Sequence, residues 1–239
     1  MFNMIIFVFL LFCAARRSIA FSCDQTRKCD EYSTIQELSD LKFTPNREQL
    51  LNLCPRTLQF FDCYFEEIQK CTVLSLPELA ATGHELASEM LKTKNLVVDI
   101  CNENSSLHED YAASIECIRD VTSSQSPVCI DDTEKVVKTF LDSRYTLDSW
   151  KDEDILSEEQ LCLEMVYTLA CFAEDINKNC GETARRVYLT VLEHSKSAVA
   201  IECSIEDDLS LKREFLDYLD LKEDDKKNAF WSVFKTFRR

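Results

Sequence analysis

A cysteine-spaced segment occurs twice in the chain, about a hundred residues apart. The first copy runs from Cys54 to Cys71 with the spacing C-x8-C-x7-C, and the second runs from Cys162 to Cys180 with the spacing C-x8-C-x8-C. In both copies an aromatic residue follows the middle cysteine, and an acidic pair, an isoleucine and a lysine come after it. Apolar residues recur every three or four positions, so we expect two helices. The repetition predicts a fold with two related halves.

Helix geometry limits how these cysteines can pair. Cys63 follows Cys54 by nine residues, which is about two and a half turns, so their side chains point to opposite sides. The same holds for Cys162 and Cys171, and for Cys171 and Cys180. We therefore expect the middle cysteines, Cys63 and Cys171, to bridge to other elements, with each motif helix in a central position.

A further predicted helix follows each copy and ends in a cysteine, Cys101 in the first half and Cys203 in the second. We expect this helix to fold back antiparallel on the motif helix and to be bridged to it. Four more cysteines have no evident counterparts in the second half: Cys23, Cys29, Cys117 and Cys129. The full connectivity stays open, because the number of pairings of twelve cysteines is on the order of ten thousand.

Residues 1–20 have the features of a signal peptide. The apolar run from Met4 to Ala15 is too short to span a membrane, and Ser18 and Ala20 are small residues where a signal peptidase reads them. Arg16 and Arg17 leave a short membrane anchor as the alternative. Cleavage after Ala20 would remove Cys13 and leave an even number of cysteines, which predicts disulfides and a secreted, extracellular protein.

The predicted disulfide cysteines are Cys23, Cys29, Cys54, Cys63, Cys71, Cys101, Cys117, Cys129, Cys162, Cys171, Cys180 and Cys203. The alternative, a set of metal ligands, has little support, since the chain has no C-x2-C pair and three histidines. We expect no cofactor and no metal. Asn104 begins an N-glycosylation sequon, Asn104-Ser105-Ser106, which fits a secreted glycoprotein.

Charge and glycine content narrow the function. The chain has a net charge of −16, or −18 without Arg16 and Arg17, so we expect it to repel nucleic acid. It has two glycines, Gly83 and Gly181, too few for phosphate-binding loops or nucleophile elbows. With few prolines and no alternating β-branched runs, the sequence predicts an all-α, disulfide-stapled helical bundle.

Start and stop signals place the helices. Thr44-Pro45 predicts a helix start, with a kink or break at Pro55. Capping boxes at Ser75–Glu78 and Ser106–Glu109 open the next two helices, the first of which continues to Cys101. The segment Ser123–Pro127 reads as a loop.

In the second half, Ser157–Gln160 is expected to cap the second motif helix, and Gly181 to end it. A last helix is predicted from Leu209 to Leu221. The helical domain is then 21–222, with halves of about 23–141 and 155–221 joined by an acidic segment. A basic tail, 223–239, follows. Its aromatic residues fall on one helical face and could contact a partner or a membrane, or pack on the body of the protein: Phe230, Trp231, Phe234 and Phe237.

No motif supports catalysis. His84, His108 and His194 lie on or near predicted helices, where structural or surface roles are expected, and no serine–histidine–acid pattern accompanies them. Acidic pairs such as Asp131-Asp132 lack the glycine-containing loop of a calcium site.

The cysteine pattern resembles that of secreted cysteine-rich helical proteins of arthropods and nematodes, such as the arthropod twenty-seven-kilodalton haemolymph glycoproteins. The residues that carry the resemblance are Cys54, Cys63-Tyr64, Cys71 and the helix to Cys101, and it extends over about Cys23 to Cys203. The resemblance implies no assigned activity and no catalytic residues.

These observations predict a secreted, non-enzymatic extracellular binding protein. Its partner would be another extracellular protein or a small apolar ligand carried inside the bundle. The alternative is a secreted hydrolase without a recognisable motif.

Overall fold

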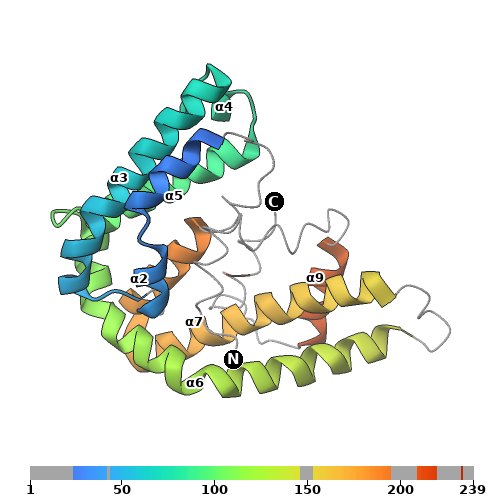
Figure 1. Cartoon of the computed structure of the whole chain (residues 1–239). Helices are drawn as coiled ribbons and strands as arrows, with labels where there is room; N and C mark the ends of the chain where they lie inside the picture. The colour runs from blue at the N-terminus through green and yellow to red at the C-terminus, as the bar shows by residue number, and fades with distance from the viewer. Residues whose placement is uncertain (1–23, 42–43, 146–152, 195–208, 220–232, 234–239) are drawn as a thin grey trace. The chain divides into compact units, whose positions relative to one another are not determined.

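A computed structural model describes residues 24–41, 44–145, 153–194, 209–219 and 233 (Figure 1). This part of the chain is helical and contains no strand, which confirms the predicted all-α fold. Its elements are η1 (Asp24–Tyr32), α2 (Ile35–Asp40), α3 (Arg47–Thr72), α4 (Leu76–Ala81), α5 (Glu85–Cys101), α6 (Ser106–Arg144), α7 (Glu153–His194) and α9 (Leu209–Tyr218). None of these helices combines the length and apolar character that a membrane-crossing helix needs.

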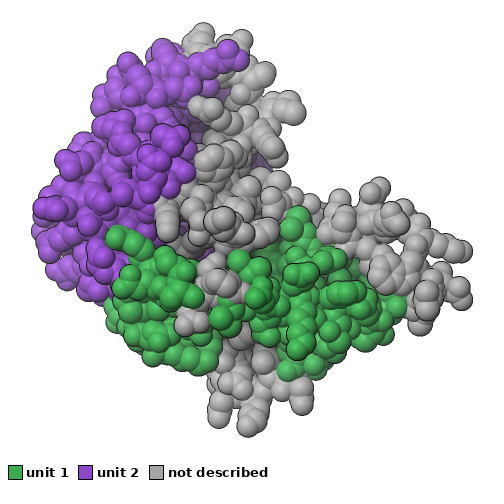
Figure 2. All heavy atoms as spheres, turned by 60° about the horizontal axis from the view of Figure 1, so that its bottom comes forward, with its two compact units in different colours: residues 1–3, 117–189, 199–239 green, residues 4–116, 190–198 purple. Residues whose placement is uncertain are grey.

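The chain divides into two compact units (Figure 2). Unit 2 contains η1, α2 to α5 and α6 up to Glu116, together with residues 190–194 at the end of α7. Unit 1 begins at Cys117 and contains the rest of α6, α7 up to Leu189, and α9. The division therefore falls inside α6, whereas the sequence pattern suggested a first half that reached residue 141.

Helix α3 is the first motif helix. It begins at Arg47, because Asn46 and Gln49 form a capping box just after the predicted start at Pro45. Of the kink or break expected at Pro55, the break is absent, because this proline lies inside α3 without ending it. The helix is fixed on both sides of the proline by buried Leu53 and Phe60, which offsets the hydrogen bond that proline cannot donate.

The apolar stripe of α3 supplies the core of unit 2. Ile68 packs with Leu76 and Leu79 of α4 and with Ala87 of α5. Closer to the start of α3, Phe60 and Phe61 pack around Cys29 of η1. Elements on either side of α3 thus bury their apolar faces against it, as its central position in the sequence pattern predicted.

The predicted helix from Ser75 to Cys101 consists of two helices. The capping box of Ser75 and Glu78 is present and opens α4, but α4 ends after Ala81. Gly83 takes a φ of +87°, which a right-handed helix cannot contain. His84 then caps α5 by accepting a hydrogen bond from the N–H of Ala87.

In unit 1, α6 and α7 run antiparallel and side by side (Figure 1). Cys117 is bonded to Cys180 and Cys129 to Cys171, and this order of pairing requires the two helices to run in opposite directions. Ser123–Pro127, predicted as a loop, is part of α6. The hydroxyl of Ser124 donates to the carbonyl of Asp120, so this serine is satisfied within the helix.

Helix α7 begins at Glu153, so Ser157 lies inside it and the predicted cap there is wrong. Gly181 interrupts it with a φ of 84° and a ψ of 175°, and a second helical segment continues to His194. Helix α9 covers most of the predicted last helix. Its Phe215 is fully buried, with its ring 5.0 Å from the ring of Phe140 and 6.0 Å from that of Tyr167.

Several predicted features lie outside the described residues. They include the signal peptide, residues 1–20, and two cysteines, Cys23 and Cys203. In the tail only Val233 is described, and it is buried. The tail aromatics Phe230, Trp231, Phe234 and Phe237 are also outside.

Candidate functional site

Both middle cysteines of the repeat bridge to another element, as predicted. Cys63 is bonded to Cys29 of η1, and Cys171 to Cys129 of α6. Cys54 is bonded to Cys101, which confirms that α5 folds back antiparallel on α3. Helix α3 is therefore held by disulfides to two different elements, η1 and α5. In α7 the middle and third cysteines of the motif, which were expected to face opposite sides, are both bonded to α6.

The disulfides correct one expectation. Cys29 precedes the first motif helix and bonds to its middle cysteine, across a sequence separation of 34. Cys129 precedes the second motif helix and bonds to its middle cysteine, across a separation of 42. The two cysteines are counterparts, which the sequence concealed because the chain between the bonded residues differs in length.

The other three cysteines of the repeat are also in disulfides. Cys180 is bonded to Cys117. Cys71 and Cys162 are also disulfide-bonded, and their partner sulfurs lie outside the described residues. Every predicted disulfide cysteine that the structure describes is thus in a disulfide.

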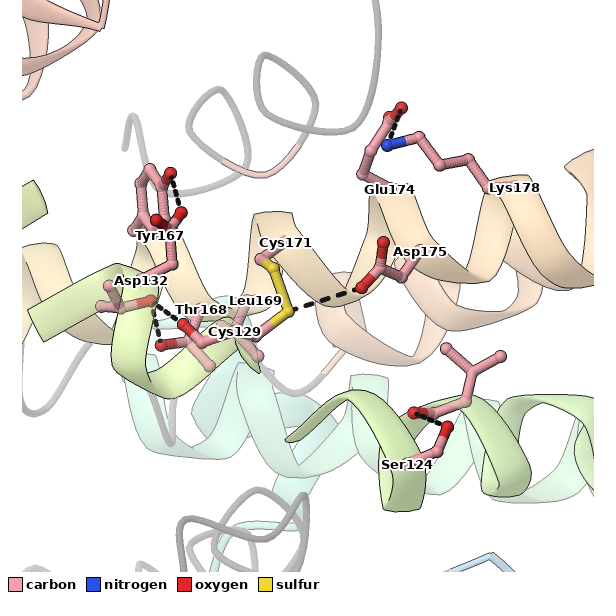
Figure 3. The surroundings of a disulfide bond; sticks show 12 residues. Ser124, Cys129, Asp132, Tyr167, Thr168, Leu169, Cys171, Glu174, Asp175 and Lys178 are labelled. Atoms are coloured by element: carbon pink, nitrogen blue, oxygen red, sulfur yellow. Dashed lines mark hydrogen bonds and ion pairs between the residues drawn. A yellow bond between two sulfur atoms is a disulfide. The ribbon is translucent and has the colours of Figure 1, made fainter. Parts of the chain in front are cut away.

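A pair of hydrogen-bonded threonines, buried in unit 2 and partly buried in unit 1, lies near each middle-cysteine disulfide. In unit 2 the hydroxyls of Thr34 and Thr57 are 2.9 Å apart. In unit 1 those of Thr133 and Thr168 are 3.0 Å apart, one helical turn from Cys129–Cys171 (Figure 3). Each unit thus has a threonine–threonine hydrogen bond near its middle-cysteine disulfide, although the positions differ, with Thr57 six residues before Cys63 and Thr168 three residues before Cys171.

The acidic pair of the motif helix is used differently in the two units. In α3, Glu67 is buried and its carboxylate lies 2.7 Å from the ammonium of Lys28 and 2.6 Å from that of Lys70. The hydrogen bonds from Lys28 and then from Lys70 lower the pKa of Glu67 below its ordinary value. This ion cluster ties η1 to α3 next to the disulfide of Cys29.

In α7 the equivalent residue is Asp175, whose carboxylate lies 3.7 Å from the sulfur of Cys129 (Figure 3). The neighbouring Glu174 pairs with Lys178 instead. Cys129, Cys171 and Asp175 are close enough together to suggest a metal site. Both sulfurs are consumed in the disulfide, so this group has no thiolate to offer a metal ion.

Two buried tyrosines take structural positions in unit 1. Tyr167 donates a hydrogen bond to Asp132, and burial followed by this bond raises the pKa of Tyr167. Burial likewise raises the pKa of Tyr188. Both phenols therefore stay protonated at neutral pH, which is unsuited to nucleophilic catalysis.

Each of the three histidines has a ring nitrogen within hydrogen-bond distance of a nearby backbone group. His84 caps α5, and the Nδ1 atom of His194 lies 2.9 Å from the carbonyl oxygen of Thr190. His108 is buried, with Nδ1 2.6 Å from the carbonyl oxygen of Ile100. These contacts fit the structural roles expected from the sequence.

The sequon lies in the short turn between α5 and α6. Asn104 is exposed there, and its backbone N–H donates to the side chain of Asn102. The capping residue of α6 is Ser105, which accepts a hydrogen bond from the N–H of His108, so the predicted cap at Ser106 was one residue late. The asparagine of the sequon is therefore accessible while its middle serine supports the helix.

A feature that the sequence reading missed is the corner between α3 and α4. Val73 and Leu74 form this corner and are 84% and 39% exposed. The hydroxyl of Thr72 lies 2.8 Å from the carbonyl oxygen of Leu74 and so braces the turn. No local signal marks this corner in the sequence, because no glycine stands between Cys71 and Ser75 to indicate a left-handed helix end.

The similarity between the two units remains internal to this chain. No protein-family model, curated protein or solved structure matches it.

Proposed function

We propose that this protein is a secreted, non-enzymatic binding protein whose partner is another extracellular protein. Disulfides of this number are typical of proteins that mature in an oxidising compartment. Together with the signal-peptide pattern of residues 1–20 they support secretion. The exposed Asn104 supports a glycan at the turn before α6.

The observation that carries this proposal is the set of large apolar side chains that the stapled helices of unit 2 leave exposed. Val73, Leu51 and Val98 are 84%, 54% and 40% exposed. Each belongs to, or directly follows, a helix fixed by the disulfide of Cys54 and Cys101. Apolar groups on a rigid surface favour protein contact, because little conformational entropy is lost when they are buried.

Carriage of a small apolar ligand calls for the opposite arrangement, with apolar side chains that line an enclosed space. The outward-facing residues therefore favour a protein partner over a carried ligand. Kinship with the secreted cysteine-rich helical proteins of arthropods and nematodes is part of the same proposal, supported by the cysteine spacing alone.

Native mass spectrometry of the protein, purified from the fluid into which it is secreted, tests the function. We expect a second polypeptide to accompany the chain. Treatment with peptide N-glycosidase should reduce the mass of the chain itself by one glycan, the one predicted at Asn104. A co-purifying lipid in place of the polypeptide would support carriage. A chain that turns over ester or peptide substrates would contradict a non-enzymatic role.

A further inference from the structure

The corner between α3 and α4 holds an unusual backbone conformation. Val73 has φ 65° and ψ −11°, which is the left-handed region. Among the described residues it is the one non-glycine residue with a positive φ. A β-branched side chain is disfavoured there, because its Cβ crowds the neighbouring carbonyl oxygen.

The second copy of the repeat provides an internal comparison. At the same point, just after the third cysteine of the motif helix, the residue with a positive φ is Gly181. Glycine takes this conformation without strain. The two conformations differ in ψ, which is 175° at Gly181 and −11° at Val73, but both have a positive φ, and the first copy has valine at that position.

Packing does not explain the valine. The residues on either side of the corner, Ile68 and Leu76, are fully buried in the core of unit 2, whereas the side chain of Val73 is 84% exposed. Backbone strain combined with exposure of an apolar group is typical of a functional contact.

The corner is also rigid. The N–H of Val73 donates to the carbonyl of Gln69, and Thr72 braces the turn. On the other side, Ser75 and Glu78 close a capping box. Cys71, two residues before Val73, is in a disulfide. Val73 and Leu74 are therefore presented in one orientation before any partner arrives, which reduces the entropic cost of binding.

We propose that Val73 and Leu74 are the apolar anchor through which this protein binds its partner, an extracellular protein that offers an apolar pocket with a basic rim. The proposal rests on the proposed binding function and names its surface. The pocket is the complement of the two exposed side chains. The basic rim complements the net charge of the chain, −16, and the exposed carboxylates that precede and follow the corner in sequence, Glu66 and Glu78. The ammonium groups of Lys28 and Lys70 at this end of α3 are paired with Glu67.

Two variants of the full-length chain separate binding from folding. Val73→Gly removes the side chain and relaxes the backbone, so it should fold at least as stably as the wild type. Leu74→Ser removes the second apolar group. The matched control is Leu161→Ser, which removes a leucine that is 39% exposed, as Leu74 is, but lies in α7 of unit 1.

The probe is a random peptide library displayed on phage and panned against the wild-type protein. We expect enriched peptides with apolar or aromatic residues next to lysine or arginine. Val73→Gly and Leu74→Ser should each weaken the binding of these peptides about tenfold or more, while Leu161→Ser binds them like the wild type. The unfolding midpoint of Val73→Gly should equal or exceed that of the wild type.

Three results would overturn the anchor. Peptides that bind Val73→Gly and the wild type with equal affinity would show that the chain binds proteins through another surface. The proposed binding function would then still hold, but the anchor would not. A library with no enriched peptide would mean that the corner lacks the proposed contact. Binding to phosphatidylcholine vesicles that Val73→Gly abolishes would assign the corner to a membrane surface instead.

Discussion

Ser105 sets the start of α6 through two hydrogen bonds. Its hydroxyl accepts from the N–H of His108 at 3.0 Å and donates to the carbonyl of Asp99 at 2.5 Å. It therefore joins the end of α5 to the first turn of α6. Ser106, which the sequence pattern favoured as the cap, is the first residue of the helix and is exposed.

Ser105→Ala should lower the free energy of unfolding by about 1 kcal/mol, because the helix loses its N-cap. Ser106→Ala should change it by less than about 0.5 kcal/mol, as is usual for an exposed position. Denaturant unfolding of protein produced without glycan measures both. Equal losses in the two variants would contradict the assignment of Ser105 as the cap.

Glu67 gives the protein a specific dependence on pH. Its pKa is lower in the folded state than the ordinary 4.5, because Lys28 and Lys70 hold the carboxylate charged. A lowered folded pKa means that this stabilisation is present above the ordinary pKa and is lost as the pH falls through the folded value. Glu67→Gln should therefore lower the melting temperature at pH 7 and flatten its decline in acid.

Calorimetry across the acid range tests this, with Glu66→Gln as the control. Glu66 neighbours Glu67 but is exposed, so its substitution should leave the acid-dependent decline in place. The same steepness in Glu67→Gln and the wild type would show that the ion cluster does not contribute to acid unfolding.

At the scale of the helices, side-chain chemistry local to a turn was predictable. The capping box at Ser75 and the helix interruption at Gly181 are both where the sequence placed them. Errors arose where a local signal competed with packing. Ser123–Pro127 reads as a loop, yet two disulfides hold α6 against α7 on both sides of it, at Cys117 and Cys129.

The corner at Val73 lay beyond sequence reasoning for a related reason. The absence of glycine near Cys71 leaves open whether α3 ends in a left-handed cap, which residue would form it, and whether the side chain of that residue is buried. Exposure depends on how α4 packs back on α3, which brings Leu76 into the core and leaves Val73 outside. That is a tertiary property with no local pattern.

The interruption of α7 at Gly181 permits a test of backbone strain by itself. No atom lies within 4 Å of the position a Cβ would take there, so Gly181→Ala adds no steric clash with other residues. Its φ of 84° is strained for alanine, and we expect a loss of about 1–3 kcal/mol in the free energy of unfolding.

Thr183→Ala is the control for this substitution, because Thr183 is exposed and lies two residues further along the same helix. It should stay within about 0.5 kcal/mol of the wild type. An unchanged stability in Gly181→Ala would indicate that α7 continues without interruption and that the backbone at Gly181 is not constrained.

At the scale of the whole molecule, the disulfides indicate one six-cysteine pattern used twice. Numbered in order within each copy, the second cysteine bonds to the fourth in both units, as Cys29–Cys63 and Cys129–Cys171. The third bonds to the sixth in unit 2, and the first bonds to the fifth in unit 1. No observed bond conflicts with a single pattern, 1–5, 2–4 and 3–6.

This pattern predicts the two bonds whose partners lie outside the described residues. By analogy with Cys117–Cys180, we expect Cys71 to pair with Cys23, and by analogy with Cys54–Cys101, Cys162 with Cys203. Mass spectrometry of peptides from an unreduced digest of the secreted protein identifies these bonds directly. Both bonds join cysteines of the same copy.

The alternative assigns Cys71 to Cys203 and Cys162 to Cys23, and it would join the first copy to the second. Peptides with those pairings would contradict the duplication of one disulfide pattern, because each copy would then depend on the other to complete its bonds. If the predicted pairs are found, each copy contains its full set of three disulfides. Either half can then acquire its bonds without the other, as two copies of one ancestral unit require.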